Sequence, residues 1–196
     1  MKFKNLTISK ETVIKGDYLK TVLELERMLD SANMKKVISK MQEVGKPMIV
    51  SHIKQLCGFD QAYTSQRLAM LRKFRLVSRE KSGREMYYSV NDFELHLASN
   101  FLKLLPKGAI ESLCHEDQFF ILENLIQECE LTVTDIFLKC RLTRAAAQRH
   151  LKSLKDSGLV YFEVRGVFHL YYPRIEALTD IAGKLEAFFI NQPQPV

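Results

Sequence analysis

The stretch from Pro47 to Val90 reads PMIVSHIKQLCGFDQAYTSQRLAMLRKFRLVSREKSGREMYYSV. Apolar residues at Ile49, Ile53 and Leu56 are spaced four and three apart, which predicts a short helix over 49–56. A glycine, Gly58, follows at the place where helices commonly end. Asp60 then stands where its carboxylate can cap a second helix, which we expect over about 61–73.

Two segments with alternating apolar and polar residues come next, at 77–81 and 85–90. A basic turn containing Gly83 separates them, so they predict a two-stranded hairpin. Two helices joined by a tight turn and followed by such a hairpin make a winged helix-turn-helix, the unit with which many proteins read DNA. The fold class we expect is therefore mainly α with small β-wings, that is, α+β.

Positive charge accumulates on the same stretch. Residues 61–84 hold seven lysines and arginines and one acidic residue. Over the whole chain the formal net charge is +6, with +7 on residues 1–100 and −1 on residues 101–196. A basic helix followed by a basic wing is the distribution expected of a surface that binds phosphates.

The residues expected to contact DNA follow from the docking of such a helix in the major groove, where its first turns face base edges. The candidates for base contacts are Gln61, Thr64, Ser65 and Arg67, with Tyr63 as a contact to a thymine methyl or a sugar. The candidates for phosphate contacts are Arg72, Lys81 and Arg84.

The string TSQRLAMLRKFRLVSREKSGREMYY resembles the arsenic-repressor (ArsR-type) winged-helix regulators. The family's Ser-x-His-Leu motif corresponds to residues 65–68, with Arg67 in place of histidine, and its Gly-Leu-Val motif to residues 75–77, with Arg75 in place of glycine. The wing string GREMYY matches the family's Gly-Arg-x-x-Tyr-Tyr. The resemblance covers roughly residues 28–97 and implies a transcriptional regulator, usually a repressor, whose terminal helices form a dimer.

The second half of the chain repeats the first at an offset of 83 residues without a gap. The coincident pairs include Ile53 and Ile136, Leu68 and Leu151, Leu71 and Leu154, Leu76 and Leu159, Val77 and Val160, Cys57 and Cys140, and Gly83 and Gly166. We therefore expect two tandem winged helices, with domains at 1–105 and 106–196 and a last amphipathic helix over 174–190.

The second copy matches the ArsR-type pattern in Gly158-Leu159-Val160, and Thr134 and Thr143 are its candidate N-caps. Arg144 and Arg149 are its candidate DNA contacts, but Val167 and Phe168 replace the arginine of the first wing. This copy could serve as an internal pseudo-dimer partner, a weaker DNA contact or a surface for another protein.

The remaining features set the class of protein. No apolar run reaches the length of a membrane span and no signal-peptide core is present, so we expect a cytoplasmic protein that does not bind a membrane. Glycine-rich phosphate loops and nucleophile motifs are absent from the sequence, so we expect no enzyme and no cofactor. The four cysteines are widely spaced, and we expect free thiols.

Metal binding is expected to be absent. The ArsR-type Leu-Cys-x-Cys-Asp metal motif corresponds to residues 56–60, where Phe59 replaces the second cysteine. The cysteines at 57 and 140 are better explained as small buried residues, and His115 is isolated in sequence. A thiol switch at either cysteine is an alternative, without a nearby signal for a lowered pKa.

Two functions remain open at this point. The first is a sequence-specific transcriptional regulator that binds double-stranded DNA through the helix at about 61–73 and the wing at about 79–88, alone as a pseudo-dimer or as a homodimer through its terminal helices. The alternative is a protein–protein or chromosome-associated scaffold built from tandem winged helices, which the near-neutral second copy fits better.

Overall fold

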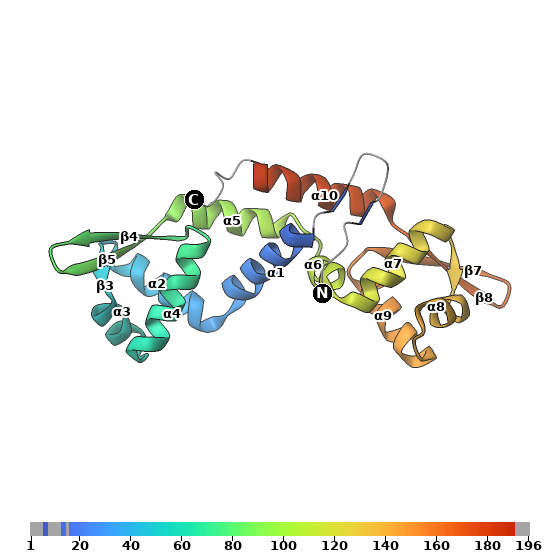
Figure 1. Ribbon diagram of the computed structural model, residues 1–196, viewed down its shortest axis with the longest axis horizontal. Helices are drawn as coiled ribbons and strands as arrows, with labels where there is room; N and C mark the ends of the chain where they lie inside the picture. Colours follow the sequence, from blue (N-terminus) through green and yellow to red (C-terminus); the bar gives the residue numbers. More distant parts are fainter. Residues whose placement is uncertain (1–5, 8–12, 15, 191–196) are drawn as a thin grey trace. The chain divides into compact units, whose positions relative to one another are not determined.

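The computed structural model describes residues 6–7, 13–14 and 16–190 of the 196-residue chain (Figure 1). The backbone forms two compact units. We call residues 24–103 the central unit, and residues 1–23 together with 104–196 the terminal unit. This grouping places residues 1–23 with the second half of the chain, whereas the sequence-based division at 105/106 places them with the first.

The central unit is helical apart from one small sheet. Its elements are the second half of α1 (Gly16–Asp30), α2 (Ala32–Val44), β3 (Met48–Ile49), α3 (Val50–Cys57), α4 (Gln61–Lys73), β4 (Val77–Ser82), β5 (Glu85–Val90) and α5 (Asp92–Lys103). The predicted helices and hairpin are all present. The strand β3 was not predicted, because two residues are too few to show an alternating pattern.

The sheet of the central unit has the antiparallel order β3-β5-β4. Val77 pairs with Val90 at one end of the hairpin, and Ser82 pairs with Glu85 at the other. β3 covers only the Tyr87–Tyr88 segment of β5. The distal part of the hairpin, from Arg79 to the loop, is exposed on the β4 strand and extends beyond the core as a wing.

The terminal unit repeats this architecture. Its elements, besides the start of α1, are β1 (Leu6–Thr7), β2 (Val13–Ile14), α6 (Ala109–Cys114), α7 (Glu116–Glu128), β6 (Leu131–Thr132), α8 (Val133–Cys140), α9 (Arg144–Asp156), β7 (Val160–Arg165), β8 (Phe168–Pro173) and α10 (Ile175–Ile190). Its second sheet has the order β6-β8-β7, which matches β3-β5-β4. Both units are thus consistent with winged helix-turn-helix folds.

The match between the units extends to single residues. α3 begins at Val50 and α8 at Val133, and α4 begins at Gln61 and α9 at Arg144, so both pairs are 83 residues apart. The five aliphatic pairs named in the sequence are buried in both units, with exposed fractions of 0–3%. The shared residues are therefore the ones that fill the two cores.

Two details differ from the sequence-based expectation. The N-cap of α8 is Thr132, not Thr134, because β6 ends there and Thr132 forms a capping box with Asp135. Helices α6 and α7 were not predicted. The expectations for residues 1–5, 8–12, 15 and 191–196 lie outside the described residues.

In the part of the chain that the structure describes, no helix combines the length and apolar character needed to cross a membrane.

Candidate nucleic-acid interface

The turn between α3 and α4 is fixed by backbone and side-chain hydrogen bonds. Gly58 adopts φ 67°, a left-handed conformation that glycine takes without strain, and the amide of Phe59 donates to the Lys54 carbonyl at 3.1 Å. The Asp60 carboxylate then accepts from the amide of Tyr63 at 2.7 Å, as predicted for the N-cap. These contacts define where α4 starts and which side of it faces outward.

Thr64 lies on the inward side of α4, and its predicted role in base contact must be corrected. Its exposed fraction is 0%, and its hydroxyl donates to the Asp60 carbonyl at 2.7 Å. Position 64 shares a helix face with the buried Leu68 and Leu71. Thr64 therefore supports the turn and presents no atom to a ligand.

Gln61, Ser65 and Arg72 do lie on the outward side of α4. All three are exposed, and their spacing of four and seven residues puts them on one face. Gln66 is exposed on the adjacent face and was absent from the candidates, although its side chain is of the type that pairs with adenine. The helical spacing of Ala62, Gln66 and Lys73 is the signal that could have identified it.

Tyr63 and Arg67 form a pair at the edge of the outward face. The Arg67 guanidinium carbon lies 4.3 Å from the centroid of the Tyr63 ring, and the Tyr63 hydroxyl accepts from Asn33 Nδ2 at 2.7 Å. Both side chains are only partly exposed. Arg67 Nε is buried and has no hydrogen-bond partner among the described residues. Arg67 therefore packs on its own helix more than the sequence suggested.

Two further basic residues, Lys73 and Arg75, lie at and just after the end of α4, and both are tied to the structure of the unit. Lys73 forms an ion pair with Glu24 of α1. Arg75 adopts φ 58°, and Gly158, at the same position of the terminal unit, adopts φ 74°. This is the position where the ArsR-type pattern has glycine, and the positive φ is the physical reason for that preference.

The wing separates its charges by face. Its loop is the two residues Gly83 and Arg84, and Gly83 supplies the positive φ, 61°, that such loops require. Cross-strand partners share a face, so Arg79 and Lys81 lie with Tyr88 and Met86, while Glu80 and Glu85 lie on the opposite face. On that acidic face Tyr87 donates to Glu85 at 3.1 Å, which raises the pKa of the tyrosine.

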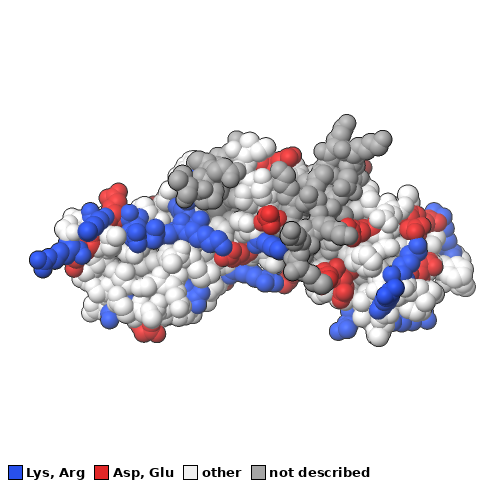
Figure 2. Space-filling model, in the orientation of Figure 1, with Lys and Arg blue, Asp and Glu red and all other residues white. Residues whose placement is uncertain are grey.

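The cations of the wing, both the predicted Lys81 and Arg84 and the additional Arg79, are exposed. Arg79, Lys81 and Arg84 all lie at the surface, and Figure 2 shows lysine and arginine side chains gathered at the tip of the β4–β5 hairpin, at the left end of that view. Arg79 was counted in the charge of the stretch but was not among the predicted contacts. Its alternation with Lys81 places both on the basic face, and we include it.

The equivalent surface of the terminal unit is less basic. Residues 144–167 hold five lysines and arginines and two acidic residues. Arg144 and Arg149 are exposed on α9, as predicted, but Arg149 lines a pocket with Lys107, His115 and Gln118. Lys152 pairs with Asp156 at 3.1 Å. The two arginines are thus exposed on one helix, and Arg149, at the position equivalent to Gln66, also lines this pocket.

The wing of the terminal unit is aromatic and apolar. Val167 and Phe168 at its tip are 88% and 60% exposed. Tyr161 stacks on Tyr172 with ring centroids 5.1 Å apart, and the Tyr172 hydroxyl donates to Glu130 at 2.7 Å. That hydrogen bond raises the pKa of Tyr172 to about 12, so the hydroxyl stays protonated. The positions equivalent to Arg79, Lys81 and Arg84 of the first wing are Phe162, Val164 and Val167. The arginine of this hairpin, Arg165, pairs with Glu130 and Glu163.

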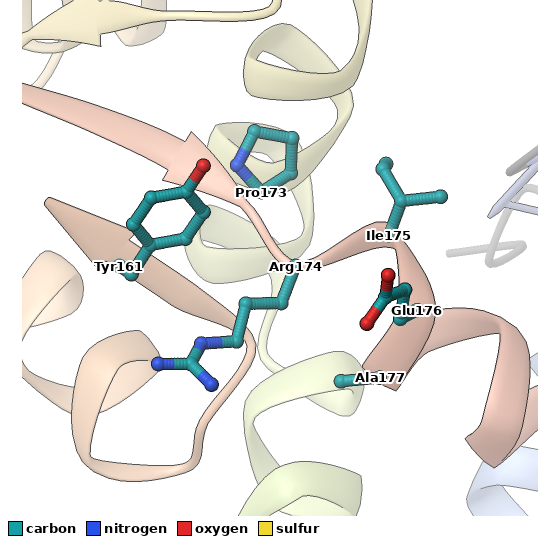
Figure 3. Close-up of a pocket in the computed structure, with 6 residues that line it drawn as sticks. All are labelled: Tyr161, Pro173, Arg174, Ile175, Glu176 and Ala177. Atoms are coloured by element: carbon teal, nitrogen blue, oxygen red, sulfur yellow. The ribbon is translucent and has the colours of Figure 1, made fainter.

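A pocket of about 520 Å³ lies where the β7–β8 hairpin meets α10 (Figure 3). Tyr161, Pro173, Arg174, Ile175, Glu176 and Ala177 line it. The Arg174 guanidinium carbon lies 5.7 Å from the centroid of the Tyr161 ring, which covers its charge on one side. The pocket is lined mainly by apolar side chains, with one cation and one carboxylate, and this set of residues does not indicate a particular reaction.

The packing of α10 is relevant to the predicted homodimer through terminal helices. Five of its residues are buried: Leu178, Ile181, Ala182, Leu185 and Phe188. Phe189 stacks on Tyr18 of α1 at 4.2 Å between ring centroids, and Lys184 donates to the Leu104 carbonyl at 3.0 Å. The apolar side of this terminal helix is therefore covered within its own chain.

Cys57 is buried as predicted, whereas Cys140 and His115 differ from their predicted surroundings. Cys57 is 1% exposed, and burial raises its pKa. Cys140 is partly exposed, and burial raises its pKa to about 11. His115 is not isolated: its imidazole lies beside that of His150, with Asp117 next to both. No local sequence pattern indicates this cluster, because it joins α9 to the start of α7.

No family model matches the chain, and no curated protein matches it. Among solved structures, NolR from Sinorhizobium fredii is 22% identical over 49% of this chain and 91% of that chain, with a TM-score of 0.38. An ArsR family transcriptional regulator is 16% identical over 48% of this chain and 96% of that chain, with a TM-score of 0.39. Each of these proteins aligns with about half of the present chain.

Proposed function

We propose that the chain is a sequence-specific DNA-binding regulator of transcription, and that its central unit reads the DNA. The observation that carries this proposal is the combination of an exposed polar face on α4 with a basic wing face beside it. α4 supplies Gln61, Ser65 and Gln66 toward base edges. Arg72, Arg79, Lys81 and Arg84 hold the phosphate backbone on either side.

The division of roles follows from exposure and charge. Thr64 is excluded because it is buried, and Arg67 acts mainly by holding the Tyr63 ring in place. Exposed cations on a wing contact phosphates without distinguishing sequences, so they set affinity, whereas the amide and hydroxyl groups on α4 set specificity. Repression is the mode that the sequence resemblance to ArsR-type regulators implies.

The experiment is fluorescence-anisotropy binding of the full chain to mixed duplex DNA at about 50 and about 200 mM salt. Four or five phosphate contacts predict an affinity loss of about 10²-fold to 10³-fold over this range. The variant Lys81→Ala/Arg84→Ala is expected to bind more weakly and to lose about two units of salt slope.

The matched control is Lys35→Ala/Lys40→Ala, which removes the same charge from α2, where the two lysines pair with Asp30 and Glu43. It should keep nearly all of the affinity. Binding that ignores salt, or equal losses in both double variants, would overturn the assignment of the wing.

A second function is favoured by the other wing. The exposed Val164, Val167 and Phe168 on the β7–β8 hairpin suit contact with a protein better than contact with phosphate. We therefore propose that the terminal unit serves protein interaction, within a pseudo-dimer or with another chain, while the central unit binds DNA. If the two units divide these roles, replacing the apolar side chains of the tip in the variant Val167→Ser/Phe168→Ser should leave DNA affinity unchanged.

A further inference from the structure

The cluster His115, Asp117 and His150 lies at one corner of the terminal unit. His115 is both the C-cap residue of α6 and the N-cap residue of α7, and Asp117 lies in the first turn of α7. His150 comes from the middle of α9. The two imidazole rings are 4.9 Å apart between centroids. Three side chains with metal-binding atoms thus converge from two segments of chain.

We propose that His115, Asp117 and His150 bind a divalent transition metal ion of the Zn²⁺ type, with a fourth position open to water. Neither the proposed DNA surface nor the aromatic wing includes these residues, so this inference is independent of the proposed function. Two imidazoles and one carboxylate are a donor set that suits zinc and its neighbours better than Mg²⁺ or Ca²⁺.

The distances fit such an ion. One donor atom from each residue can be chosen so that all three lie within 4.8 Å of one another. His150 Nε2 and Asp117 Oδ2 are 3.4 Å apart. Two ligands bound tetrahedrally at about 2.1 Å from zinc are themselves about 3.4 Å apart. That pair already has the spacing of a shared metal, and His115 is exposed, so its side chain has room to adjust toward the other two ligands.

An independent observation comes from Gln118, one residue after Asp117. Gln118 is 7% exposed, and its side-chain oxygen has no hydrogen-bond partner among the described residues. It lines the same pocket as His115. A buried acceptor normally has a donor, and a water on a metal ion is the kind of donor that this oxygen lacks.

Charge around the cluster works in both directions. Lys107, Arg149 and Lys152 line the pocket and oppose a cation, while Glu111 and Asp156 line it too and offset part of this positive charge. The Asp117 carboxylate supplies the negative charge at the binding position itself.

The test uses the full chain, with any affinity tag removed and metal stripped by chelation, titrated with Co²⁺ and followed by visible absorption. One Co²⁺ per chain is expected, with the ligand-field bands of a nitrogen and oxygen site and no thiolate charge-transfer band in the near ultraviolet. Zn²⁺ should displace it. Addition of Zn²⁺ should also raise the melting temperature, because it binds the folded chain.

His115→Ala and Asp117→Asn should each weaken Co²⁺ binding tenfold or more and abolish the Zn²⁺-dependent rise in melting temperature. Both positions are at the surface or partly exposed, so circular dichroism should show an intact fold. His169→Ala, on the β7–β8 hairpin of the same unit, is the matched control and should bind as the parent does.

Three results would overturn the proposal. One is no Co²⁺ binding at millimolar concentrations. Another is undiminished binding in a folded His115→Ala variant. The third is a thiolate band that disappears on cysteine alkylation, which would place the metal on cysteines instead. In each case the three residues would make only structural contacts, with His150 Nε2 and Asp117 Oδ2 packed 3.4 Å apart.

Discussion

The guanidinium of Arg67 covers the ring of Tyr63 one turn earlier on α4, with 4.3 Å between the guanidinium carbon and the ring centroid. Its Nη1 reaches Met70 Sδ at 3.6 Å, while its Nε is buried without a partner among the described residues. The same side chain therefore gains a cation–π contact and leaves one donor unsatisfied. The balance between the two effects can be measured.

Replacing Arg67 by methionine is expected to stabilise the central unit. A cation–π contact of this kind contributes about 0.5–1 kcal/mol, whereas a buried unsatisfied donor costs about 1–3 kcal/mol. Methionine keeps the apolar stem, so Arg67→Met should gain up to about 1 kcal/mol in urea unfolding followed by circular dichroism. Arg67→Ala, which also loses the stem, should be less stable than the parent. A loss above about 1 kcal/mol in Arg67→Met would show that the guanidinium is needed for packing.

The two faces of the wing should respond differently to charge removal. Arg79→Ala removes a cation from the basic face and should weaken DNA binding about threefold to tenfold, with a drop of about one unit in salt slope. Glu80→Ala, on the adjacent residue but the opposite face, should leave affinity unchanged or slightly higher. Anisotropy titrations at several salt concentrations separate the two. Equal losses in both variants would mean that the hairpin does not approach DNA by one face.

The positive φ at Arg75 predicts that glycine is the better residue there. Holding a non-glycine residue in this conformation costs about 1–2 kcal/mol, which glycine avoids. Glycine loses more backbone entropy on folding, and this offsets about 0.5–1 kcal/mol of that advantage. Arg75→Gly should therefore stabilise the central unit by about 0.5–1 kcal/mol in thermal or urea unfolding.

The reciprocal variant tests the same reasoning in the terminal unit. Gly158 has φ 74°, and an added Cβ would meet nothing within 4 Å, so Gly158→Ala introduces conformational strain without a clash. It should destabilise the chain by about 1 kcal/mol. An unchanged stability in Gly158→Ala would contradict the strain argument for both positions.

Thiol labelling should follow burial. Cys129 is exposed, Cys57 is 1% exposed, and the pKa of Cys140 is about 11. At pH 8 only about one Cys140 thiol in 10³ is ionised, and the thiolate is the reactive form. Timed alkylation with mass spectrometry should modify Cys129 first, with Cys57 and Cys140 much slower. Rapid labelling of Cys57 or Cys140 in the folded chain would revive the thiol-switch alternative.

The capping box of α8 gives a pH-dependent stability. Hydrogen bonds from the hydroxyl and amide of Thr132 lower the pKa of Asp135. Since the folded pKa lies below the unfolded value of about 3.9, the stabilisation is present above that pH and is lost as pH falls through the folded pKa. Asp135→Asn should cost about 0.5–2 kcal/mol at pH 7, and its difference from the parent should shrink below pH 4. A difference independent of pH would contradict this assignment.

Local sequence patterns were enough to predict the boundaries of α3, α4 and the hairpin, and the buried aliphatic positions that recur 83 residues later. Helix and strand periodicities are local, and a glycine or an aspartate acts on the backbone beside it, so Gly58 and Asp60 could be read directly. The 83-residue offset revealed the second core in the same way, because core positions are the ones that packing restricts.

Which polar side chains are available to a ligand depends on the packing of the whole unit. Thr64 and Ser65 are adjacent in sequence, but one is buried and the other exposed, because the face that α4 turns inward depends on its packing against the rest of the unit. The grouping of residues 1–23 with the terminal unit is likewise a long-range result. His115, Asp117 and His150 meet only because α9 packs beside the start of α7. Contacts between distant segments depend on the whole fold, and no local pattern records them.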